Sequence, residues 1–399
     1  MKIGIIREEK QPADKRVAFA PQQCKELLQN YSGLELVIQP SPWRCYKDEE
    51  YQAKGILVQE NLSDCDVLFG IKEIPKEKLM EGKQYFFFSH TIKKQPHNKT
   101  LLQSCIEKNI KLTDYECLTY TNEARVLGFG RYAGIVGTYN AFLAYGKRNN
   151  LFSLIPANQL QHYKPDIENE LKSVKLPVIK IVLTGGGRVA NGAMEILDFM
   201  NIRKVTPKEI LSENFNEPVY TQLNPEDYYT LNGKHEFDFH YLHHHPQEFK
   251  SDFLKYTKVA DVFISCHFWD NRGPKFFSKE DAKKPNFKIK VIADITCDLN
   301  GSVPTTIRSS KIEDPVYGYN PETENEDEPF KENVITIMAV DNLPCELPRD
   351  SSHDFGKDLI DKVMPHLLGD DADKMIERAT ICKAGKLMPA FEYLSDYIA

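Results

Sequence analysis

The first half of the chain alternates short apolar runs with segments of helical pattern. The apolar runs predict five strands, over Lys2–Ile6, Leu34–Ile38, Asp66–Gly70, Tyr85–Phe88 and Ile110–Leu112. Helices are expected between them, over Pro21–Leu28, where a proline suits the first helical turn, and over Lys99–Lys108. Strands that alternate with helices predict βαβ units and a parallel sheet, and continuously apolar strands indicate helices on both faces.

The second half repeats this rhythm after a helix that is rich in small residues. That helix is expected over Arg131–Tyr145. Its glycines Gly134 and Gly137 predict close packing of backbones, because a helix-interior glycine costs up to about 1 kcal/mol relative to alanine. Four apolar runs then predict strands, over Val178–Leu183, Val262–Ser265, Val291–Ile295 and Val334–Val340.

Three further segments complete the pattern. The stretch 212–258 is rich in tyrosine and histidine and too long for an ordinary connection, so we interpret it as an insertion. The acidic run Glu322–Glu328 is expected to be a solvated loop. The segment Gly356–Ala399 is helical in pattern and is expected to fold back on the first half.

Composition and charge narrow the class of protein. The chain has 399 residues, with 51 basic and 58 acidic side chains and a formal charge of −7, so it lacks the basic field of a nucleic-acid-binding protein. No apolar run reaches the ~20 residues that span a bilayer, so no membrane partner is expected. The sequence enters a strand-like segment at once, which leaves no room for a secretory signal and predicts a cytoplasmic protein. None of the nine cysteines stands at C-x-x-C spacing, which argues against a disulfide framework or a zinc ribbon.

The sharpest local motif is a glycine block between a strand and a helix. Gly185, Gly187 and Ala190 stand at G-x-G-x-x-A spacing within Ile181–Ala193. This fingerprint makes a tight turn, lets the backbone approach a pyrophosphate and places the phosphate at a helix N-terminus. The motif predicts a dinucleotide site, whereas a phosphate-binding loop of the G-x-x-x-x-G-K type is absent from the sequence.

Ionisable residues follow several of the predicted strands. In an open parallel sheet, ligands bind outside the carboxyl ends of the strands. In the first half these ends carry Lys72, His90 and Glu116. A lysine and a histidine are a plausible base and acid if their surroundings move their pKa values toward neutrality. In the second half the strand ends carry Cys266, His267, the run Asp294 to Asp298, and Asp341.

Two arginines and a histidine cluster are candidate ligand-binding groups. Arg16 and Arg125 occupy loop-like positions, and the fixed fork of a guanidinium suits carboxylates, so an anionic substrate is expected. A histidine cluster could bind a metal, but no matching carboxylate or cysteine spacing supports it, and no metal site is predicted. Its members are His240, His243, His244 and His245.

Several sequence blocks together resemble the superfamily of alanine dehydrogenase and the lysine-linked saccharopine dehydrogenases. The opening blocks are Ile5–Lys10 and Lys15–Pro21, and the more particular ones are Gly70–Pro75, Phe86–Lys93, Leu112–Glu116, Arg125–Gly134 and Val340–Pro348. The particular blocks look like saccharopine-forming enzymes, above all the lysine–2-oxoglutarate reductase half of the bifunctional eukaryotic enzyme. The likeness covers almost the whole chain.

This resemblance implies a fold and a set of site residues. The fold is α/β, with two Rossmann-like, doubly wound parallel-sheet domains and an interdomain cleft. The substrate and catalytic domain would comprise 1–133 and 345–399, and the dinucleotide domain 134–344.

The resemblance also implies roles for single residues. Lys72 matches the proton acceptor of the family, His90 the proton donor and Glu116 a supporting carboxylate. Substrate contacts are matched by Arg16, Gln95, Arg125 and Phe129. Together with the glycine motif and the strand that follows it, the predicted nucleotide contacts are Gly185, Gly187, Arg188, Val189, Thr206, Cys266, His267, Phe268, Val340, Asp341, Asn342 and Leu343.

Two departures from the family pattern change the expectations. Ala124 stands where fungal members have an arginine beside Arg125, so dicarboxylate binding can be arranged differently. Val189 stands where fungal members carry one of a cysteine pair, which excludes such a link to Cys266.

The coenzyme is expected to be NADP(H) rather than NAD(H). The strand after the glycine block is taken as Arg203–Pro207, which puts Thr206 where an NAD enzyme carries a carboxylate. A hydroxyl flanked by lysines would accept a 2′-phosphate. In the alternative interpretation, Glu209 turns back to the ribose and NAD(H) is bound.

The predicted activity is the interconversion of saccharopine with L-lysine and 2-oxoglutarate using NAD(P)(H). Alanine dehydrogenase chemistry is the alternative within the class, and a catalytically silent nucleotide-binding sensor is the alternative outside it. The sequence leaves open the direction of the reaction, a close analogue of lysine as substrate, and the oligomeric state.

Overall fold

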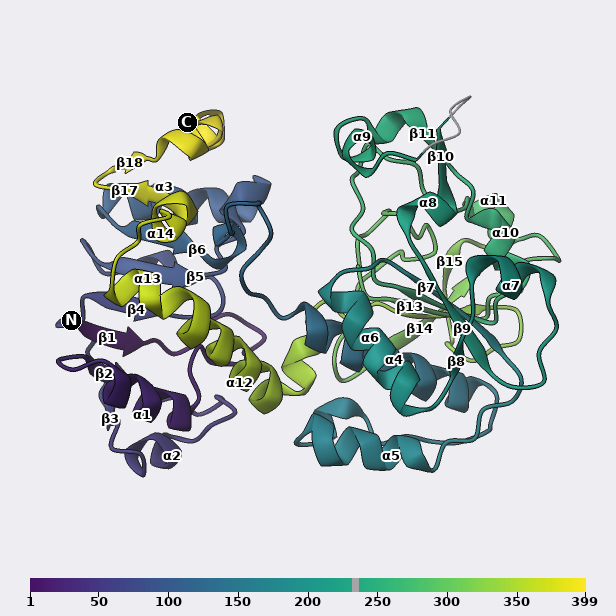
Figure 1. Cartoon of the computed structure of the whole chain (residues 1–399), viewed down its shortest axis with the longest axis horizontal. Coiled ribbons are helices and arrows are strands. Elements are labelled where there is room, and N and C mark those ends of the chain that lie inside the picture. The colour runs from purple at the N-terminus through teal and green to yellow at the C-terminus, as the bar shows by residue number, and fades with distance from the viewer. Residues whose placement is uncertain (232–236) are drawn as a thin grey trace. The chain divides into compact units, whose positions relative to one another are not determined.

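The chain forms two eight-stranded sheets, one in each of two units, in the computed structural model, which describes residues 1–231 and 237–399 (Figure 1). Residues 1–129 and 348–399 form unit 1, so both ends of the colour scale meet there, and residues 130–347 form unit 2. These limits differ by three to four residues from the domain limits given above. No helix among the described residues is long and apolar enough to cross a membrane.

Unit 1 is a doubly wound parallel sheet with two antiparallel strands added. Its order is β18-β17-β6-β5-β4-β1-β2-β3, and the six strands from β3 to β6 are parallel. The strands are β1 Lys2–Ile5, β2 Glu35–Ile38, β3 Leu57–Val58, β4 Val67–Phe69, β5 Gln84–Phe87, β6 Lys111–Asp114, β17 Thr380–Lys383 and β18 Lys386–Leu387. The helices are α1 Pro21–Asn30, α2 Asp48–Gln52, α3 Lys99–Glu107, α12 Pro348–Asp358, α13 Met364–Leu368, α14 Met375–Ala379 and α15 Ser395–Ile398.

The C-terminal segment corrects one expectation, because it supplies strands as well as helices. β17 pairs antiparallel with β6, and β18 pairs with β17. The segment also contributes to the core, where the Phe355 ring stacks on Phe129 with ring centroids 4.4 Å apart and meets Tyr115 edge-on at 5.1 Å. The return of the chain to unit 1 therefore completes both the sheet and the core.

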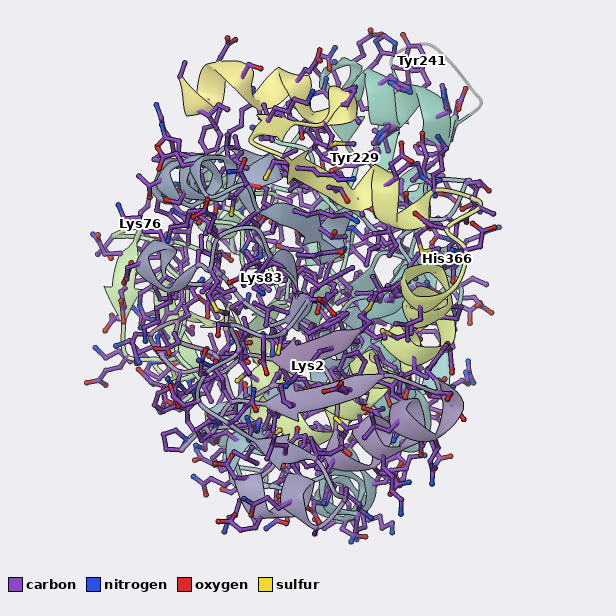
Figure 2. The ribbon with its side chains drawn as sticks, turned by 90° about the vertical axis from the view of Figure 1, so that its left-hand side faces the viewer. Lys2, Lys76, Lys83, Tyr229, Tyr241 and His366 are labelled. Carbon is purple, nitrogen blue, oxygen red and sulfur yellow. The ribbon has the colours of Figure 1, made fainter. Side chains whose placement is uncertain are left out.

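The amino ends of the parallel strands in unit 1 carry lysines that are bound to neighbouring loops. Lys2, at the start of β1, donates to Asp64, and Lys83, before β5, donates to the backbone oxygen of Ser63 (Figure 2). The candidate catalytic residues follow the carboxyl ends of the same strands, at the opposite edge of the sheet.

Unit 2 is built on the same plan. Its order is β15-β14-β16-β13-β12-β7-β9-β8. The six neighbouring strands β16, β13, β12, β7, β9 and β8 are parallel, whereas β14 pairs antiparallel with both β16 and β15. Its strands are β7 Lys180–Thr184, β8 Arg203–Lys204, β9 Val219–Leu223, β12 Val262–Ser265, β13 Val291–Asp294, β14 Val316–Asn320, β15 Asn325–Asp327 and β16 Ile335–Met338. The helices are α4 Gly130–Arg148, α5 Glu168–Lys172, α6 Arg188–Phe199, α7 Pro207–Ser212, α8 Pro225–Tyr228, α9 Phe239–His244, α10 Leu254–Thr257 and α11 Lys279–Ala282.

Two sequence expectations for unit 2 were wrong. Part of the acidic run 322–328 forms strand β15, whose side chains stay largely exposed while its backbone pairs with β14. The expected insertion 212–258 contains β9, a central strand of the sheet. The departure from the sheet begins only at Pro225 and includes a two-stranded ribbon of β10 Tyr229–Leu231 and β11 Phe249–Ser251. Residues 232–236 of that stretch lie outside the described residues.

Helices α4 and α6 pack with their backbones in close approach. A Cβ on Gly134 would lie 1.9 Å from the Val189 oxygen, and one on Gly192 would lie 2.0 Å from the Arg131 oxygen. The expectation of close backbone packing at Gly134 is confirmed.

The nine cysteines, all within the described ranges, form no disulfide. Six are buried, namely Cys24, Cys65, Cys105, Cys266, Cys345 and Cys382.

Candidate functional site

The loop after β1 and the turn after β4 meet at the carboxyl edge of the unit 1 sheet. The parallel strands lie in the order β3-β2-β1-β4-β5-β6, so the chain builds the sheet in one direction from β1 to β3 and in the other direction from β4 to β6. The winding therefore reverses between β1 and β4. Ligands of doubly wound sheets bind at this point. Arg16 follows β1 and Lys72 follows β4, so the topology brings these two predicted residues together.

Lys72 is held by a buried carboxylate that the sequence analysis did not assign. Glu8 accepts the backbone N–H of Ile71 at 2.6 Å and that of Lys72 at 2.8 Å. Burial and the charge of Asp14 raise the pKa of Glu8 to about 8, although these two hydrogen bonds act against the rise. Burial and the nearby charge of Arg16 lower the pKa of the Lys72 amine from its usual value, against the opposing effect of Asp14. The site therefore favours a lysine that can exist as a neutral amine.

Arg16 is buried and paired with a neighbour. Its guanidinium contacts Asp14 through Nη2–Oδ2 at 2.6 Å and Nε–Oδ1 at 2.9 Å, and it lies 4.2 Å over the centre of the Phe129 ring. Although burial acts in the opposite direction, the Arg16 charge holds the pKa of Asp14 well below its usual range. Any substrate carboxylate would therefore meet an arginine already held in place by Asp14 and Phe129.

His90 is oriented by Glu73, the residue next to Lys72. Its Nδ1 lies 2.6 Å from Oε1 of Glu73, and Lys10 donates to the other oxygen of Glu73 at 3.0 Å. Burial opposes ionisation, but the contact with His90 outweighs it and lowers the pKa of Glu73 to about 2. An ionised carboxylate only accepts hydrogen bonds, so Nδ1 carries the proton and Nε2 is left to exchange one.

Glu116 binds two cations of the same unit. Its Oε1 lies 3.2 Å from Lys93 Nζ and 3.4 Å from Arg125 Nη2. The Glu116 side chain is buried, with Oε2 lacking a hydrogen-bond partner among the described residues, whereas Arg125 is 56% exposed. Asp114, which the sequence analysis did not single out, accepts the backbone N–H of Glu116 at 2.7 Å and that of Ser89 at 2.9 Å, and so ties the ends of β5 and β6 together.

Gln95 lies apart from this hydrogen-bonded group. Its side chain is exposed, and its amide oxygen lies 3.5 Å from Asn98 Nδ2. Of the predicted unit 1 residues, the structure links Arg16 with Phe129 and Glu116 with Arg125, and it links His90 to Glu73, the neighbour of Lys72 in the chain.

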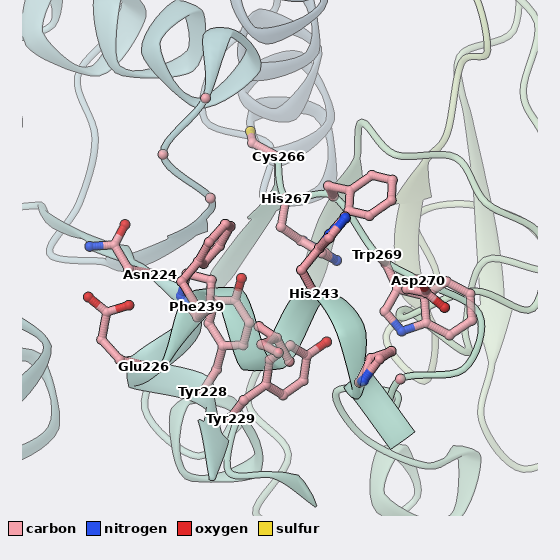
Figure 3. A pocket seen from close by; sticks show the side chains of 18 of the residues that line it. Asn224, Glu226, Tyr228, Tyr229, Phe239, His243, Cys266, His267, Trp269 and Asp270 are labelled. Carbon is pink, nitrogen blue, oxygen red and sulfur yellow. The ribbon is translucent and has the colours of Figure 1, made fainter. Parts of the chain in front are cut away.

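Unit 2 contains a cavity of about 670 Å³ beside the glycine block (Figure 3). It is lined by residues after β7, β9 and β12 and by α9, among them Gly185, Gly187, Arg188, Val189, Asn224, Glu226, Phe239, His243, Cys266, His267 and Phe268. β7 and β12 flank the reversal of winding in this sheet, the expected place for a ligand.

The glycine block fits a dinucleotide pyrophosphate. Gly185 has a φ of +98°, and a Cβ there would lie 2.7 Å from the Cys266 oxygen, so other residues are excluded. Gly187 has open space where its Cβ would be, directly before the 12-residue helix α6. Its backbone can approach a phosphate at a helix N-terminus.

The residues after β12 have different environments. His267 is buried between Thr184 and Ser302, each 2.8 Å from a ring nitrogen, and burial lowers its pKa to about 3, so it is neutral. Phe268, by contrast, is 82% exposed at the cavity. His267 therefore stabilises the cavity wall, whereas the exposed ring of Phe268 is accessible from the cavity.

The strand on which the prediction for Thr206 rested is shorter than expected. The expected strand Arg203–Pro207 is only the two-residue edge strand β8, and β9 lies beside β7 instead. The Thr206 hydroxyl accepts the backbone N–H of Glu209, and the Glu209 carboxylate accepts that of Thr206. Both side chains cap α7, and neither lines the cavity.

The block after β16 contributes mainly to the core. Val340 and Leu343 are buried, Asp341 is exposed and Asn342 is half-buried. None of these four residues lines the cavity described above.

Two histidine groups were compared as metal ligands. On α9, only His243 of the histidine cluster lines the cavity. In unit 1, a set that the sequence analysis did not predict places His366 Nδ1 3.5 Å from Asp371 and 3.2 Å from Asp373. Both aspartates also accept backbone N–H groups at the start of α14, which accounts for their position without a metal.

The chain is similar to known proteins along most of its length. Residues 4–136 match the model of the alanine dehydrogenase/PNT N-terminal domain. The chain is 26% identical over 380 residues to the saccharopine dehydrogenase [NAD(+), L-lysine-forming] of Schizosaccharomyces pombe, which covers 90% of this chain and 91% of that one. The chain is therefore similar to members of the alanine dehydrogenase superfamily, and the family model itself matches residues 4–136.

Longer relatives and solved structures extend the comparison. The chain is 28% identical over 440 residues to the alpha-aminoadipic semialdehyde synthase of Arabidopsis thaliana, covering 98% of this chain but 41% of the relative, so it spans less than half of that protein. A solved L-alanine dehydrogenase matches over 100% of both chains with a TM-score of 0.65 and 15% identity, which supports the fold. The resemblance found in the sequence and the α/β fold of two mostly parallel sheets are confirmed.

Proposed function

We propose that the chain is an oxidoreductase that interconverts saccharopine with L-lysine and 2-oxoglutarate, using a nicotinamide coenzyme. The observation that carries this proposal is the pairing of Glu73 with His90 next to the half-buried Lys72, whose pKa is lowered. General acid–base chemistry needs two such groups poised within one site. The fungal relatives that match over most of their length, named as saccharopine dehydrogenases, support the choice of substrate.

In the reductive direction, the lysine amine attacks the keto carbon of 2-oxoglutarate and a water molecule leaves. The amine must lose protons as the carbon–nitrogen bond forms, and neutral Lys72 would accept one. The departing hydroxyl must gain a proton, and His90 would donate it from Nε2 while Glu73 holds Nδ1–H. A nicotinamide coenzyme, when bound, would supply the hydride that reduces the carbon of the resulting protonated imine, which gives the secondary amine of saccharopine.

The substrate carboxylates would bind to the arginines of unit 1. Arg125 is largely exposed and shares Glu116 with Lys93, so it can reach an anionic ligand. Arg16 is fixed by Asp14 and Phe129, which positions its guanidinium without a ligand present. Ala124 offers no second guanidinium beside Arg125, so Lys93 is the neighbouring cation we propose for the second carboxylate.

Two alternatives remain distinct from this proposal. An alanine dehydrogenase would use pyruvate and ammonium, and the likeness to a solved L-alanine dehydrogenase at 15% identity supports a shared fold only. A silent nucleotide sensor would have no need of the Glu73–His90 pair beside a lysine whose pKa is lowered.

The test measures oxidation of reduced coenzyme with four substrate pairs. These are 2-oxoglutarate with lysine, with ornithine or with ammonium, and pyruvate with ammonium. Turnover that requires both lysine and 2-oxoglutarate is the expected result. Turnover with pyruvate and ammonium alone would favour the first alternative, and no turnover with any pair would favour the second. The cytoplasmic location stays a prediction, to be checked by cell fractionation.

A further inference from the structure

The cavity in unit 2 has two chemically different walls. Asn224 and Glu226, which follow β9, form a polar side, and Phe239 of α9 lies near them, whereas Trp269 and Asp270 lie across the cavity (Figure 3). Phe268 and Phe239 are 82% and 66% exposed, the most exposed large apolar side chains in the part of the chain that the structure describes. Two exposed aromatic rings in one cavity provide apolar surface for a flat ligand group.

The end of β9 lies directly against the glycine block. The backbone N–H of Gly185 donates to the Leu223 oxygen at 2.9 Å, and a Cβ on Gly186 would lie 3.3 Å from Asn224 Oδ1. In dinucleotide-binding sheets, the strand beside the glycine strand ends in the residue that binds the adenosine ribose. Here that strand is β9 and not β8, so the ribose position belongs to Asn224 and Glu226.

The charges at this end of the cavity favour an unphosphorylated ribose. Glu226 is exposed and lines the cavity, whereas the other lining carboxylate, Asp270, is paired with Arg272 at 2.7 Å. Lys204, one of the lysines that flank Thr206 in the sequence, donates to Gln222 at 2.7 Å and is not a lining residue. A carboxylate accepts hydrogen bonds from ribose hydroxyls and repels a phosphate.

We propose that the adenosine half of the coenzyme binds here, with Phe239 and Phe268 against the adenine ring and Glu226 on the ribose hydroxyls. The protein then prefers NADH to NADPH, which replaces the preference inferred from Thr206. The inference rests on the proposed function, because the ligand is the coenzyme of that reaction. It also assigns a role to the segment after Pro225, which contributes Glu226 and Phe239 to the subsite.

Calorimetric titration of the full chain with ADP-ribose and with 2′-phospho-ADP-ribose tests the proposal without turnover. The wild-type protein is expected to bind ADP-ribose about 10-fold or more tightly than its 2′-phosphorylated form, as one unfavourable charge contact predicts. Glu226→Gln should bring the two affinities together by improving binding of the phosphorylated ligand. Glu213→Gln, an exposed glutamate of the same unit that does not line the cavity, should leave the ratio unchanged.

The aromatic contacts predict a different pattern. Phe239→Ala and Phe268→Ala should each weaken both ligands by about 10-fold and leave their ratio unchanged, since stacking on the base does not involve the ribose. Phe330→Ala is the matched control, because Phe330 is exposed in the same unit and lies outside the cavity lining.

Equal or tighter binding of 2′-phospho-ADP-ribose by the wild-type protein would overturn the inference, as would a ratio that Glu226→Gln does not change. Failure to bind either ligand would also overturn it. If the binding pattern is as expected but no lysine-dependent turnover occurs, the adenosine subsite stands and the proposed reaction fails.

Discussion

Glu73 lies beside both proposed proton-transfer residues, next to Lys72 in the chain and 2.6 Å from His90 in space. His90 itself follows β5 with a φ of +53°, a left-handed conformation that non-glycine residues rarely adopt. The turn and the carboxylate together fix the direction of the imidazole. Glu73 therefore orients a proposed proton-transfer residue, His90, without reacting itself.

Replacing Lys72 by Met or His90 by Gln should slow turnover by about 10²–10⁴-fold, the usual contribution of a general acid or base. ADP-ribose affinity should stay near the wild-type value, because the cavity lining lies entirely in unit 2. Steady-state kinetics and calorimetry measure the two effects. Near-normal turnover in both variants would remove these residues from the mechanism.

Asp14→Asn should shift the pH dependence of turnover toward lower pH. Lys72 acts as a base only when neutral, and the charge of Asp14 raises its pKa. Removing that charge lowers the Lys72 pKa, so the neutral amine forms at lower pH. The rising limb of kcat/KM against pH measures this in the direction in which Lys72 accepts a proton.

The control for this profile is Asp64→Asn, since Asp64 pairs with Lys2 near the opposite edge of the sheet. Its limb should stay in place. An Asp14→Asn limb that moves to higher pH would contradict the assignment of Lys72 as the base.

Lys72 and His90 could be predicted from the sequence because each follows a continuous apolar run, and such runs place their next residues at one sheet edge. Glu116 could be predicted because it follows the short expected strand Ile110–Leu112. Glu8 could not, because its contacts with Ile71 and Lys72 depend on the parallel pairing of β1 with β4, which brings together residues about 60 positions apart. The effect of Asp14 on the pKa of Lys72 depends on the same pairing. A loop carboxylate carries no local signal of the strand that it will face.

At the scale of elements, the neighbours of a strand were harder to predict than the strand itself. The sequence shows clear apolar runs at the positions of four strands, β7, β12, β13 and β16. β9, in contrast, reads Val-Tyr-Thr-Gln-Leu within a polar, tyrosine-rich stretch, and β8 has only two residues. The parallel strands of unit 2 therefore lie in the order β8-β9-β7-β12-β13-β16, with β9 rather than β8 beside the glycine strand β7. Counting about 20 residues from the glycine block leads to the end of β8, whereas the strand that lies beside β7 ends at Leu223.

Gly134→Ala should destabilise unit 2 by about 3 kcal/mol, because the new methyl group would overlap backbone atoms of α6 rather than a movable side chain. The displaced start of α6 should also weaken ADP-ribose binding. Chemical denaturation and calorimetry measure both effects. Lys147→Ala, an exposed change in the same helix, should alter neither, and a fully stable Gly134→Ala protein would show that α4 and α6 can separate at little cost.

At the scale of the whole molecule, unit 1 is formed from two segments of the chain that are far apart in the sequence. The chain leaves unit 1 after Phe129 and returns at Pro348 to add β17 and the buried residues of α12. The sequence pattern predicted the return of this segment but not its strands, because β17 is four residues long and follows the short helix α14 directly.

A chain ending at Leu347 should keep unit 2 folded and lose unit 1. Unit 2 retains its complete eight-stranded sheet, whereas β6 loses its partner β17, and Tyr115 and Phe129 lose Phe355. Limited proteolysis should degrade residues 1–129 first, and ADP-ribose should still bind. A shortened chain whose residues 1–129 resist proteolysis would contradict this prediction.

The rates at which buried cysteines are alkylated measure local opening of the protein. A thiol reacts with an alkylating reagent as the thiolate, and burial raises the pKa of Cys24, Cys105, Cys382 and Cys266. Each therefore reacts only after its surroundings open. The first three lie in unit 1 and Cys266 in unit 2, so mass spectrometry of a timed labelling reaction yields separate opening rates for the two units in one sample. Because Cys266 also lines the cavity, its labelling rate with and without a ligand measures how strongly that ligand holds unit 2 closed.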